Sequence, residues 1–249
     1  MTVRRRILGV DVDAMTLEDV VRKCQDAIEQ RAPIVVGCVN AAKLVNMQHH
    51  VELRDAVNSS DFLVADGMAV VWASRLLKCP LPERIAGIDL FVRLLQEGGA
   101  RGQSVYLLGA RQEVVEEVVK RVERDYPGLR VAGYRNGYFS DDEIPEILDD
   151  IRASGADMLF LGITPPKKEI FLARWGRDVS VFVAHGVGGA FDVLADKVPR
   201  APMLFQRFGM EWFFRVLQEP RRMWKRYLVT NTSFILMVLR ELMWGPRAS

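Results

Sequence analysis

An aspartate stands directly after a short apolar run in the first third of the chain. The run Phe62–Ala65 stops at Asp66-Gly67, which predicts a buried strand whose carboxyl end carries one acid. Proteins of the α/β class usually place their chemistry at that end of a strand, and a single carboxylate there is a candidate general base. Asp66 would equally suit the N-cap of a helix expected from Met68. Both interpretations stay open on spacing alone.

A second polar residue follows the preceding apolar run in the same way. Ile34–Val39 is short and β-branched, which predicts a buried strand, and Asn40 then precedes a helix that carries Leu44. Asn40 can cap that helix or direct its side-chain amide at a ligand hydroxyl. Because the carboxyl ends of parallel strands meet at one edge of a sheet, we expect Asn40 and Asp66 to lie near each other.

Three basic residues are candidates for binding a phosphate group. Arg84 ends a proline-rich, rigid connection, and its guanidinium can form a fork on a phosphate. It can equally pair with Glu83 or Asp89 at the surface. Lys167 and Lys168 follow another predicted strand at the start of a helix, where two cations and free helix amides would suit a diphosphate. Ordinary surface lysines are the alternative for this pair.

A glycine-rich turn follows the strand predicted at Val181–Ala184. It contains Gly186, Gly188 and Gly189 and leads to Asp192. Glycines at this spacing let the backbone approach a ligand closely, and their amides can line an anion or sugar site. One such turn is a weak sign of function when it stands alone.

No pattern in the sequence predicts a metal or a cofactor. The Asp11-Val12-Asp13 triplet resembles the metal-binding D-x-D of nucleotide-sugar transferases, but no third oxygen ligand is near, and acids ahead of a helix more often form a turn. The three histidines show no metal-ligand spacing. Neither a Walker A sequence nor a full G-x-G-x-x-G is present, which argues against ATP and NAD.

Strands and amphipathic helices alternate along most of the chain. Besides the strands already named, apolar runs predict strands at Arg6–Val12, Ser104–Gly109, Arg130–Tyr134 and Met158–Gly162. Helices with one apolar face are expected between them, as from Thr16 to Gln30. This alternation predicts an α/β fold with a parallel sheet covered by helices on both faces.

The composition is that of an ordinary soluble globular chain. Its 249 residues are 49% hydrophobic and 27% charged, enough for one large core or two small ones. A net charge of +2 gives no bulk basic character, so nucleic acid is not an expected partner. Three widely spaced cysteines fit reduced thiols, and the basic N-terminus lacks an apolar segment of signal-peptide length. We expect an intracellular protein.

The character of the chain changes after Pro199. Basic and aromatic residues interleave there at helical spacing, which is typical of a helix at a membrane interface. Polar residues interrupt the apolar stretch Leu228–Trp244, so it falls short of the roughly 20 apolar residues that span a bilayer. We interpret residues 200–249 as a peripheral, amphipathic helical appendage to a core of residues 1–199. Core helices with arginine-rich outer faces and an RNA-binding segment are the alternatives. The cations expected to meet the membrane or a membrane-bound acceptor are Arg207, Arg215, Arg221, Arg222, Lys225 and Arg226.

Several short motifs occur in a fixed order along the chain. They are Val39-Asn40-Ala41, Ala65-Asp66-Gly67-Met68, Pro82-Glu83-Arg84 with Ala86-Gly87, Tyr126-Pro127-Gly128, Arg135-Asn136-Gly137-Tyr138-Phe139, Pro166-Lys167-Lys168-Glu169, Gly186-Val187-Gly188-Gly189-Ala190-Phe191-Asp192 and Gln218-Glu219-Pro220-Arg221-Arg222. Through these motifs the chain resembles the WecG/TagA/CpsF glycosyltransferases, family twenty-six, over nearly its whole length.

The resemblance implies a Rossmann-like fold and a metal-independent, inverting transferase without a cofactor. Such an enzyme moves N-acetylmannosamine or another hexose from a UDP donor to a polyprenyl-diphosphate-linked saccharide at the cytoplasmic membrane surface, in cell-envelope or exopolysaccharide synthesis. The family's proposed base falls on Asp66 and the arginine of its R-x-A-G segment on Arg84. Lys168 stands where glutamine is usual and Cys38 where threonine is usual, and both bear on the choice of donor sugar. The resemblance leaves the oligomeric state open, a homo-oligomer included.

Roles for the site residues follow from this chemistry. In an inverting transfer, the base takes the proton of the acceptor hydroxyl as that oxygen attacks the anomeric carbon. We expect Asp66 to be this base, and we expect Arg84 and the lysines to offset the charge on the leaving diphosphate. A non-catalytic membrane scaffold and a nucleotide-dependent oxidoreductase are the competing functions. The residues expected to bind substrate are Asn40, Gly67, Arg84, Asp89, Lys167, Lys168, Glu169, Gly186, Gly188, Gly189 and Asp192.

Overall fold

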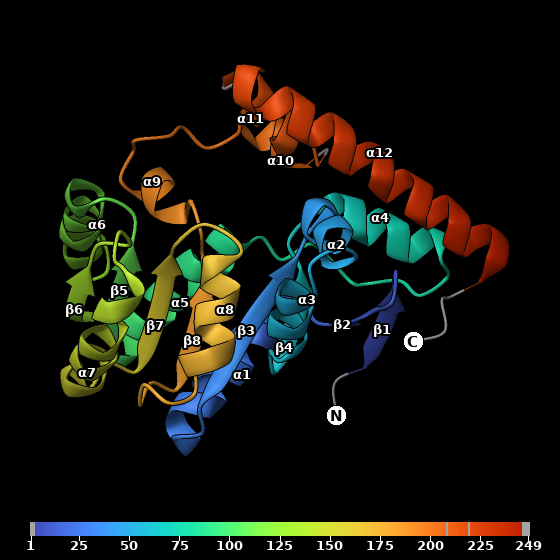
Figure 1. Cartoon of the computed structure of the whole chain (residues 1–249). Helices are drawn as coiled ribbons and strands as arrows, with labels where there is room; N and C mark the ends of the chain where they lie inside the picture. The colour runs from blue at the N-terminus through green and yellow to red at the C-terminus, as the bar shows by residue number, and fades with distance from the viewer. Residues whose placement is uncertain (1–2, 208, 219, 246–249) are drawn as a thin grey trace.

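Six strands form the central sheet of the computed structural model, which describes residues 3–207, 209–218 and 220–245 (Figure 1). They are β3 Ile34–Val39, β4 Phe62–Ala65, β5 Ser104–Gly109, β6 Arg130–Arg135, β7 Met158–Gly162 and β8 Val183–Gly186. Their spatial order is β4-β3-β8-β7-β5-β6. Each neighbouring pair is parallel, so the predicted parallel, Rossmann-like sheet is confirmed.

Helices cover both faces of this sheet (Figure 1). Those that precede residue 200 are α1 Leu17–Gln30, α2 Ala41–Met47, α3 Val51–Asn58, α4 Met68–Leu76, α5 Gly87–Arg101, α6 Gln112–Asp125, the 3-10 turn η1 Asp141–Glu143, α7 Ile144–Ser154, α8 Lys167–Trp175 and α9 Ala190–Leu194. Successive side chains of a buried strand point to opposite faces. Leu107 of β5 therefore packs in one core cluster with α1, α5 and α6, and Leu108 packs in another with α7 and α8.

The chain begins with a two-stranded hairpin, so the single strand expected at Arg6–Val12 is wrong. β1 (Arg4–Ile7) and β2 (Val10–Asp13) pair in antiparallel register. Leu8 and Gly9 reverse the chain between them, with φ angles of 50° and 81°, as a two-residue hairpin turn requires. Each acid of the D-x-D triplet pairs with an arginine of β1, Asp11 with Arg6 at 3.6 Å and Asp13 with Arg4 at 3.2 Å. Asp13 also accepts a hydrogen bond of 2.9 Å from the Leu63 amide, which ties the hairpin to the sheet.

The strand β8 lies two residues later than the expected Val181–Ala184. Its pairing with β7 starts at Met158↔Val183 and continues to Leu161↔Gly186. The apolar run in the sequence stops before His185, so the hydrophobic pattern alone ends the strand too early. In the structure His185 is part of the strand. As a result, Gly186 ends a central strand and the glycine-rich turn begins at the carboxyl edge of the sheet.

The C-terminal segment forms three helices, α10 (Met203–Arg207), α11 (Glu211–Gln218) and α12 (Pro220–Trp244). Figure 1 shows them above the carboxyl ends of the strands, with α12 passing over α2 and α4. Phe234 and Val238 of α12 are buried in the core cluster that contains Leu44 and Val70. Within the described residues, no helix is both long and apolar enough to cross a membrane.

One histidine is fully buried at the centre of the sheet. The ring nitrogen Nδ1 of His185 lies 2.9 Å from the Val36 carbonyl oxygen and donates to it in the neutral ring. Its Nε2 is buried and has no hydrogen-bond partner among the described residues. Burial is the main reason that the pKa of His185 is lowered from 6.5 to about 4. The ring is therefore neutral at physiological pH.

This buried ring predicts a loss of stability in mild acid. Since the folded-state pKa lies below the unfolded value, the unfolded chain binds a proton below pH 6.5 that the native protein does not bind. The free energy of unfolding should fall by about 3 kcal/mol as the pH drops from about 6.5 to about 4. Urea denaturation across this range should show the fall for the wild type and a smaller one for His185→Gln. His49→Gln, at an exposed site, should keep the wild-type slope; an equal slope for His185→Gln would contradict the assignment.

Candidate active site

Asp66 lies at the carboxyl edge of the sheet, directly after β4. Its backbone amide donates to the Val39 carbonyl over 2.8 Å, and its Oδ1 accepts a hydrogen bond of 3.0 Å from the Gly87 amide. The expectation that Asp66 caps the helix from Met68 is wrong, because Gly67 is the N-cap of α4 and makes no side-chain cap bond. Asp66 instead binds the first amide of α5, where the helix dipole favours a negative charge. This bond fixes one orientation of the carboxylate.

Asn40 lies beside Asp66, as the sequence predicts. Its Oδ1 accepts a hydrogen bond of 3.0 Å from the Lys43 amide, so Asn40 caps α2. Strand pairing ends at Val39↔Ala65, which places Asn40 opposite Asp66. The next residue, Gly67, approaches so closely that an added Cβ would lie 3.4 Å from the Asn40 Cβ. The two strand ends therefore present an amide and a carboxylate side by side.

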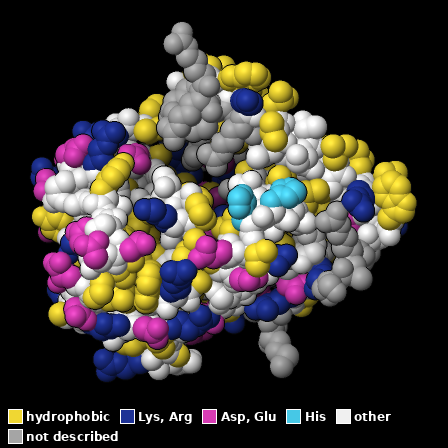
Figure 2. All heavy atoms as spheres, viewed as in Figure 1, with side chains coloured by type: hydrophobic (Ala, Val, Ile, Leu, Met, Phe, Trp, Pro, Cys, Tyr) yellow, Lys and Arg dark blue, Asp and Glu magenta, His cyan; other side chains and the backbone are white. Residues whose placement is uncertain are grey.

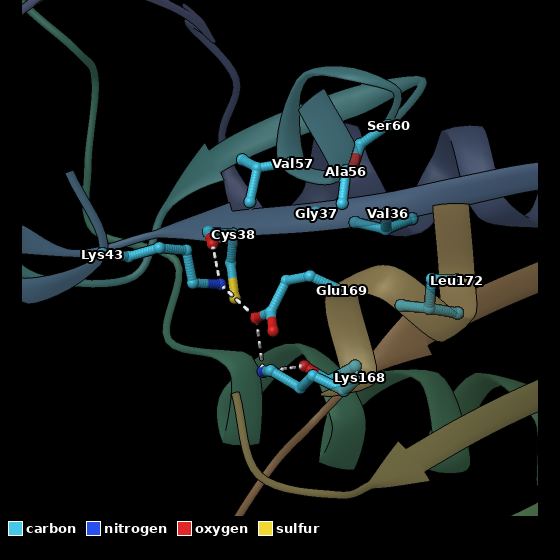
Figure 3. Close-up of a pocket in the computed structure, with 11 residues that line it drawn as sticks. Val36, Gly37, Cys38, Lys43, Ala56, Val57, Ser60, Lys168, Glu169 and Leu172 are labelled. Carbon is cyan, nitrogen blue, oxygen red and sulfur yellow. Dashed lines mark hydrogen bonds and ion pairs between the residues drawn. The ribbon is translucent and has the colours of Figure 1, made fainter. Parts of the chain in front are cut away.

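A buried cluster of three charges joins α8 to the end of β3 (Figure 3). Lys43 Nζ lies 2.7 Å from Glu169 Oε1 in an ion pair and donates to the Cys38 carbonyl over 2.6 Å. Lys168 Nζ donates to the Gly186 carbonyl over 3.0 Å and lies 3.7 Å from the same Glu169 oxygen. All three side chains are less than 10% exposed. A cavity of about 20 Å³ adjoins them, which is room for roughly one water molecule.

The cluster holds one more positive charge than negative. Burial opposes the charge on Lys43, but Cys38 and the Glu169 carboxylate outweigh it, so the pKa of Lys43 is raised. Lys43 is therefore charged and neutralises Glu169 at close range. Lys168 lies an ångström farther from that carboxylate than Lys43 does, and its Nζ is 3.6 Å from the position of a Cβ at Gly188. A Cβ there would be in ordinary van der Waals contact with this ammonium group, and the φ angle of 55° at Gly188 would disfavour it.

Two of the expected site residues in these turns are exposed. Lys167, the first residue of α8, is exposed, as is Gly189. The amides of Val187 and Gly188 both donate to the Leu161 carbonyl, over 2.9 and 3.1 Å. These two amides are therefore satisfied within the protein. Asp192 lies in the first turn of α9 and is half-buried.

Arg84 is held between two carboxylates. Its Nη2 lies 3.3 Å from Asp89 Oδ2, so it makes one of the two ion pairs that the sequence leaves open, although its side chain is mostly buried and not at the surface. Glu83, the other expected partner, instead accepts a hydrogen bond of 2.6 Å from the Leu17 amide. The second partner of Arg84 is Glu211 at the start of α11. Asp89 also pairs with Arg200, in the connection that leads to α10.

Asp66 acts electrostatically on the groups around it. Its charge helps to raise the pKa of Lys43 and opposes the lowering of the pKa of His185. Burial is the main cause of the raised pKa of Glu211, and Asp66 and Asp89 add to it while Arg84 and Arg200 oppose it. Asp66, which follows β4, is therefore close enough to act on Lys43 of α2 and on Glu211 of α11.

The structure thus brings most of the expected site residues to one edge. It also adds Lys43, Arg200 and Glu211, which the sequence analysis did not single out as site residues. Lys43 had a local signal, since it lies three residues after Asn40 in a predicted helix cap. Lys225 is exposed on α12. The remaining expected acceptor cations have side chains outside the described residues: Arg207, Arg215, Arg221, Arg222 and Arg226.

Comparison with known proteins bears on what this edge does. The family model described as the glycosyl transferase WecG/TagA/CpsF family matches residues 5–248. An N-acetylglucosaminyldiphosphoundecaprenol N-acetyl-beta-D-mannosaminyltransferase of Bacillus spizizenii is 42% identical over 185 residues, or 74% of this chain and 70% of the relative. A protein of the same name from Bacillus subtilis is 34% identical over 214 residues, or 86% of this chain and 82% of the relative. The chain belongs to the WecG/TagA/CpsF glycosyltransferase family.

Proposed function

We propose that this glycosyltransferase moves an N-acetylhexosamine, with inversion and without a metal, from a UDP donor to a polyprenyl-diphosphate-linked saccharide. The relatives are named for transfer of N-acetyl-β-D-mannosamine to N-acetylglucosaminyl-diphosphoundecaprenol, which makes this sugar and this acceptor the first candidates. The observation that carries the proposal is the Asp66 carboxylate, fixed by the Gly87 amide among the cations of one sheet edge. A fixed carboxylate beside clustered cations suits transfer from a sugar diphosphate.

In this mechanism Asp66 is the general base. The acceptor hydroxyl gives its proton to the carboxylate as its oxygen forms a bond to the anomeric carbon of the donor. The bond from that carbon to the diphosphate oxygen breaks on the opposite face, and UDP leaves with the electron pair. Arg84, Lys167 and Lys168 offset the negative charge that grows on the diphosphate. The amide of Asn40 and the turn from Gly186 to Asp192 hold the sugar or the nucleotide.

The two lysines of the buried cluster, Lys43 and Lys168, differ in how closely each is paired with Glu169. Lys43 is already paired with Glu169 at 2.7 Å, so its role is to keep α8 docked on β3. Lys168 has a carbonyl partner and shares the same Glu169 oxygen, at the longer distance of 3.7 Å. One carboxylate between two buried ammonium groups leaves one positive charge without a counter-ion of its own, which is costly, and an anionic ligand offsets that cost. We therefore assign Lys168, and not Lys43, to the donor.

The acceptor reaches this edge from a membrane through residues 200–249. Large hydrophobic side chains are exposed on the outer face of α12, among them Leu228, Ile235, Leu236 and Leu239, and Figure 2 shows hydrophobic side chains gathered along the C-terminal helices. Such an exposed apolar stripe beside cations suits insertion into the headgroup region of a bilayer. We propose peripheral binding at the inner face of the cell membrane, with nucleic acid playing no part.

Replacing Asp66 tests the catalytic assignment. Asp66→Asn keeps the shape and removes the base, so kcat should fall by about 10²–10⁴-fold, measured with radiolabelled UDP-N-acetylhexosamines and a short-chain lipid-diphosphate acceptor. Asp11→Asn, in the arginine-paired D-x-D triplet, is the matched control and should keep the wild-type rate with or without EDTA. Wild-type turnover by Asp66→Asn would refute the mechanism, and activity abolished by EDTA would refute metal independence.

Charged substitutions on α12 test the membrane assignment. The double variant Leu236→Glu/Leu239→Glu should reduce binding to vesicles that contain anionic lipid, because it places two carboxylates in the exposed apolar stripe. Sedimentation with vesicles measures binding, and turnover of a soluble short-chain acceptor should stay near the wild-type rate. Tyr134→Glu, on the edge strand β6, is the control and should sediment like the wild type. Unchanged sedimentation of the α12 variant would place the membrane contact elsewhere.

A further inference from the structure

The guanidinium of Arg84 is fixed by acids from two distant parts of the chain. Asp89 of α5 holds Nη2 at 3.3 Å, and Glu211 of α11, which follows Arg84 by 127 residues, holds Nη1. The Arg84 side chain is 12% exposed, so water competes little for these contacts. A guanidinium has five N–H donors. Within the described residues two of them are used, one for each acid, and we propose that the others serve a ligand.

These contacts are part of a row of four side chains with alternating charges. Asp89 uses its other oxygen to pair with Arg200, so the order in the row is Glu211, Arg84, Asp89, Arg200. The two outer residues of the row belong to the C-terminal segment, and the two inner residues belong to the region around the start of α5. The loop that presents Arg84 is thereby attached to the C-terminal segment at two points.

Glu211 stands where a carboxylate is electrostatically costly. Burial and the nearby charges of Asp66 and Asp89 all raise its pKa, and Arg84 and Arg200 oppose this. A glutamine or an apolar residue could pack at this place without that cost. The position of the acid is therefore explained by its contact with Arg84, the residue that we propose meets the diphosphate of the donor.

We infer that Glu211 is a positioning residue of this enzyme: it fixes the guanidinium of Arg84 beside Asp66, so that the free N–H groups meet the donor's diphosphate as its charge grows. The inference rests on the role proposed for Arg84. It adds that the C-terminal segment supplies an acid to the site, besides the cations expected to meet the acceptor.

This role has a kinetic signature. Glu211 neutralises part of the charge on Arg84, so its removal does not weaken the attraction of the site for UDP. Removal frees the guanidinium to adopt other orientations, and misplacement of about 1 Å can cost 10²-fold in rate. We expect kcat to fall while the affinity for UDP is unchanged or higher. A contact that only holds the fold together would lower the melting temperature and leave the kcat of the folded enzyme unchanged.

The test compares Glu211→Gln, Glu211→Asp and Arg84→Ala with the wild type. Glu211→Gln should lower kcat by about tenfold or more, with a UDP Kd from titration calorimetry no weaker than that of the wild type. Glu211→Asp, which keeps the charge on a shorter side chain, should recover part of the rate and covers the case in which Glu211→Gln does not fold. Adding Glu211→Gln to Arg84→Ala should cause no further loss. Glu97→Gln is the matched control, since Glu97 is an arginine-paired acid of similar exposure on α5, and it should keep the wild-type kcat.

Three results would overturn the inference. One is a wild-type kcat for folded Glu211→Gln, and another is a rise in kcat/KM, which would make Glu211 a competitor of the substrate for Arg84. The third is a wild-type kcat for Arg84→Ala, which would refute the proposed role of Arg84 itself. Loss of rate in Arg84→Ala together with full rate in Glu211→Gln would refute the positioning role alone.

Discussion

The carboxyl edge of a parallel sheet is the constraint on which the other features of this protein depend. The carboxyl ends of parallel strands lie at the same edge of the sheet. Asp66, Asn40 and the turns after β7 and β8 therefore meet there, although they are far apart in sequence. The Gly87 amide then fixes Asp66 by joining the end of β4 to the start of α5. The C-terminal helices lie above the same edge (Figure 1). A base, several cations and a covering segment therefore share one place.

Ion pairs between distant residues hold the side chains at this edge of the sheet in place. The region holds Lys43 and Lys168 around Glu169, and Arg84 and Arg200 around Asp89. An isolated buried ion costs several kcal/mol, and a close counter-ion offsets most of that cost. The Lys43–Glu169 pair, with its short contact, is therefore structural. We propose that Lys168, whose contact with that carboxylate is longer, and Arg84, which uses two of its N–H groups within the described residues, are the groups left to bind an anion.

The sequence predicts the parts of this structure that depend on short-range patterns. The bounds of β3, β4, β5 and β7 follow from apolar runs that end at a polar residue or a glycine, and Asp66 and Asn40 follow from those bounds. The hairpin at Leu8-Gly9 was missed because its turn carries only one glycine, and β8 was misplaced because His185 interrupts its apolar run. Glu211 and Arg200 could not be predicted, because their partners lie more than a hundred residues away and are brought near only by the fold.

A structure of the protein with UDP bound is the most direct test of this site. We expect the diphosphate within hydrogen-bond distance of Arg84 or Lys168, outside the carboxyl ends of β3, β4 and β8, with Asp66 facing the side from which the acceptor attacks. A different polar cleft, of about 220 Å³, lies between the N-terminal hairpin and the end of α3 and is lined by Arg4, Arg6, Asn58 and Ser60 among others. UDP in that cleft, or anywhere away from Asp66, would contradict the roles proposed for Asp66, Arg84 and Lys168.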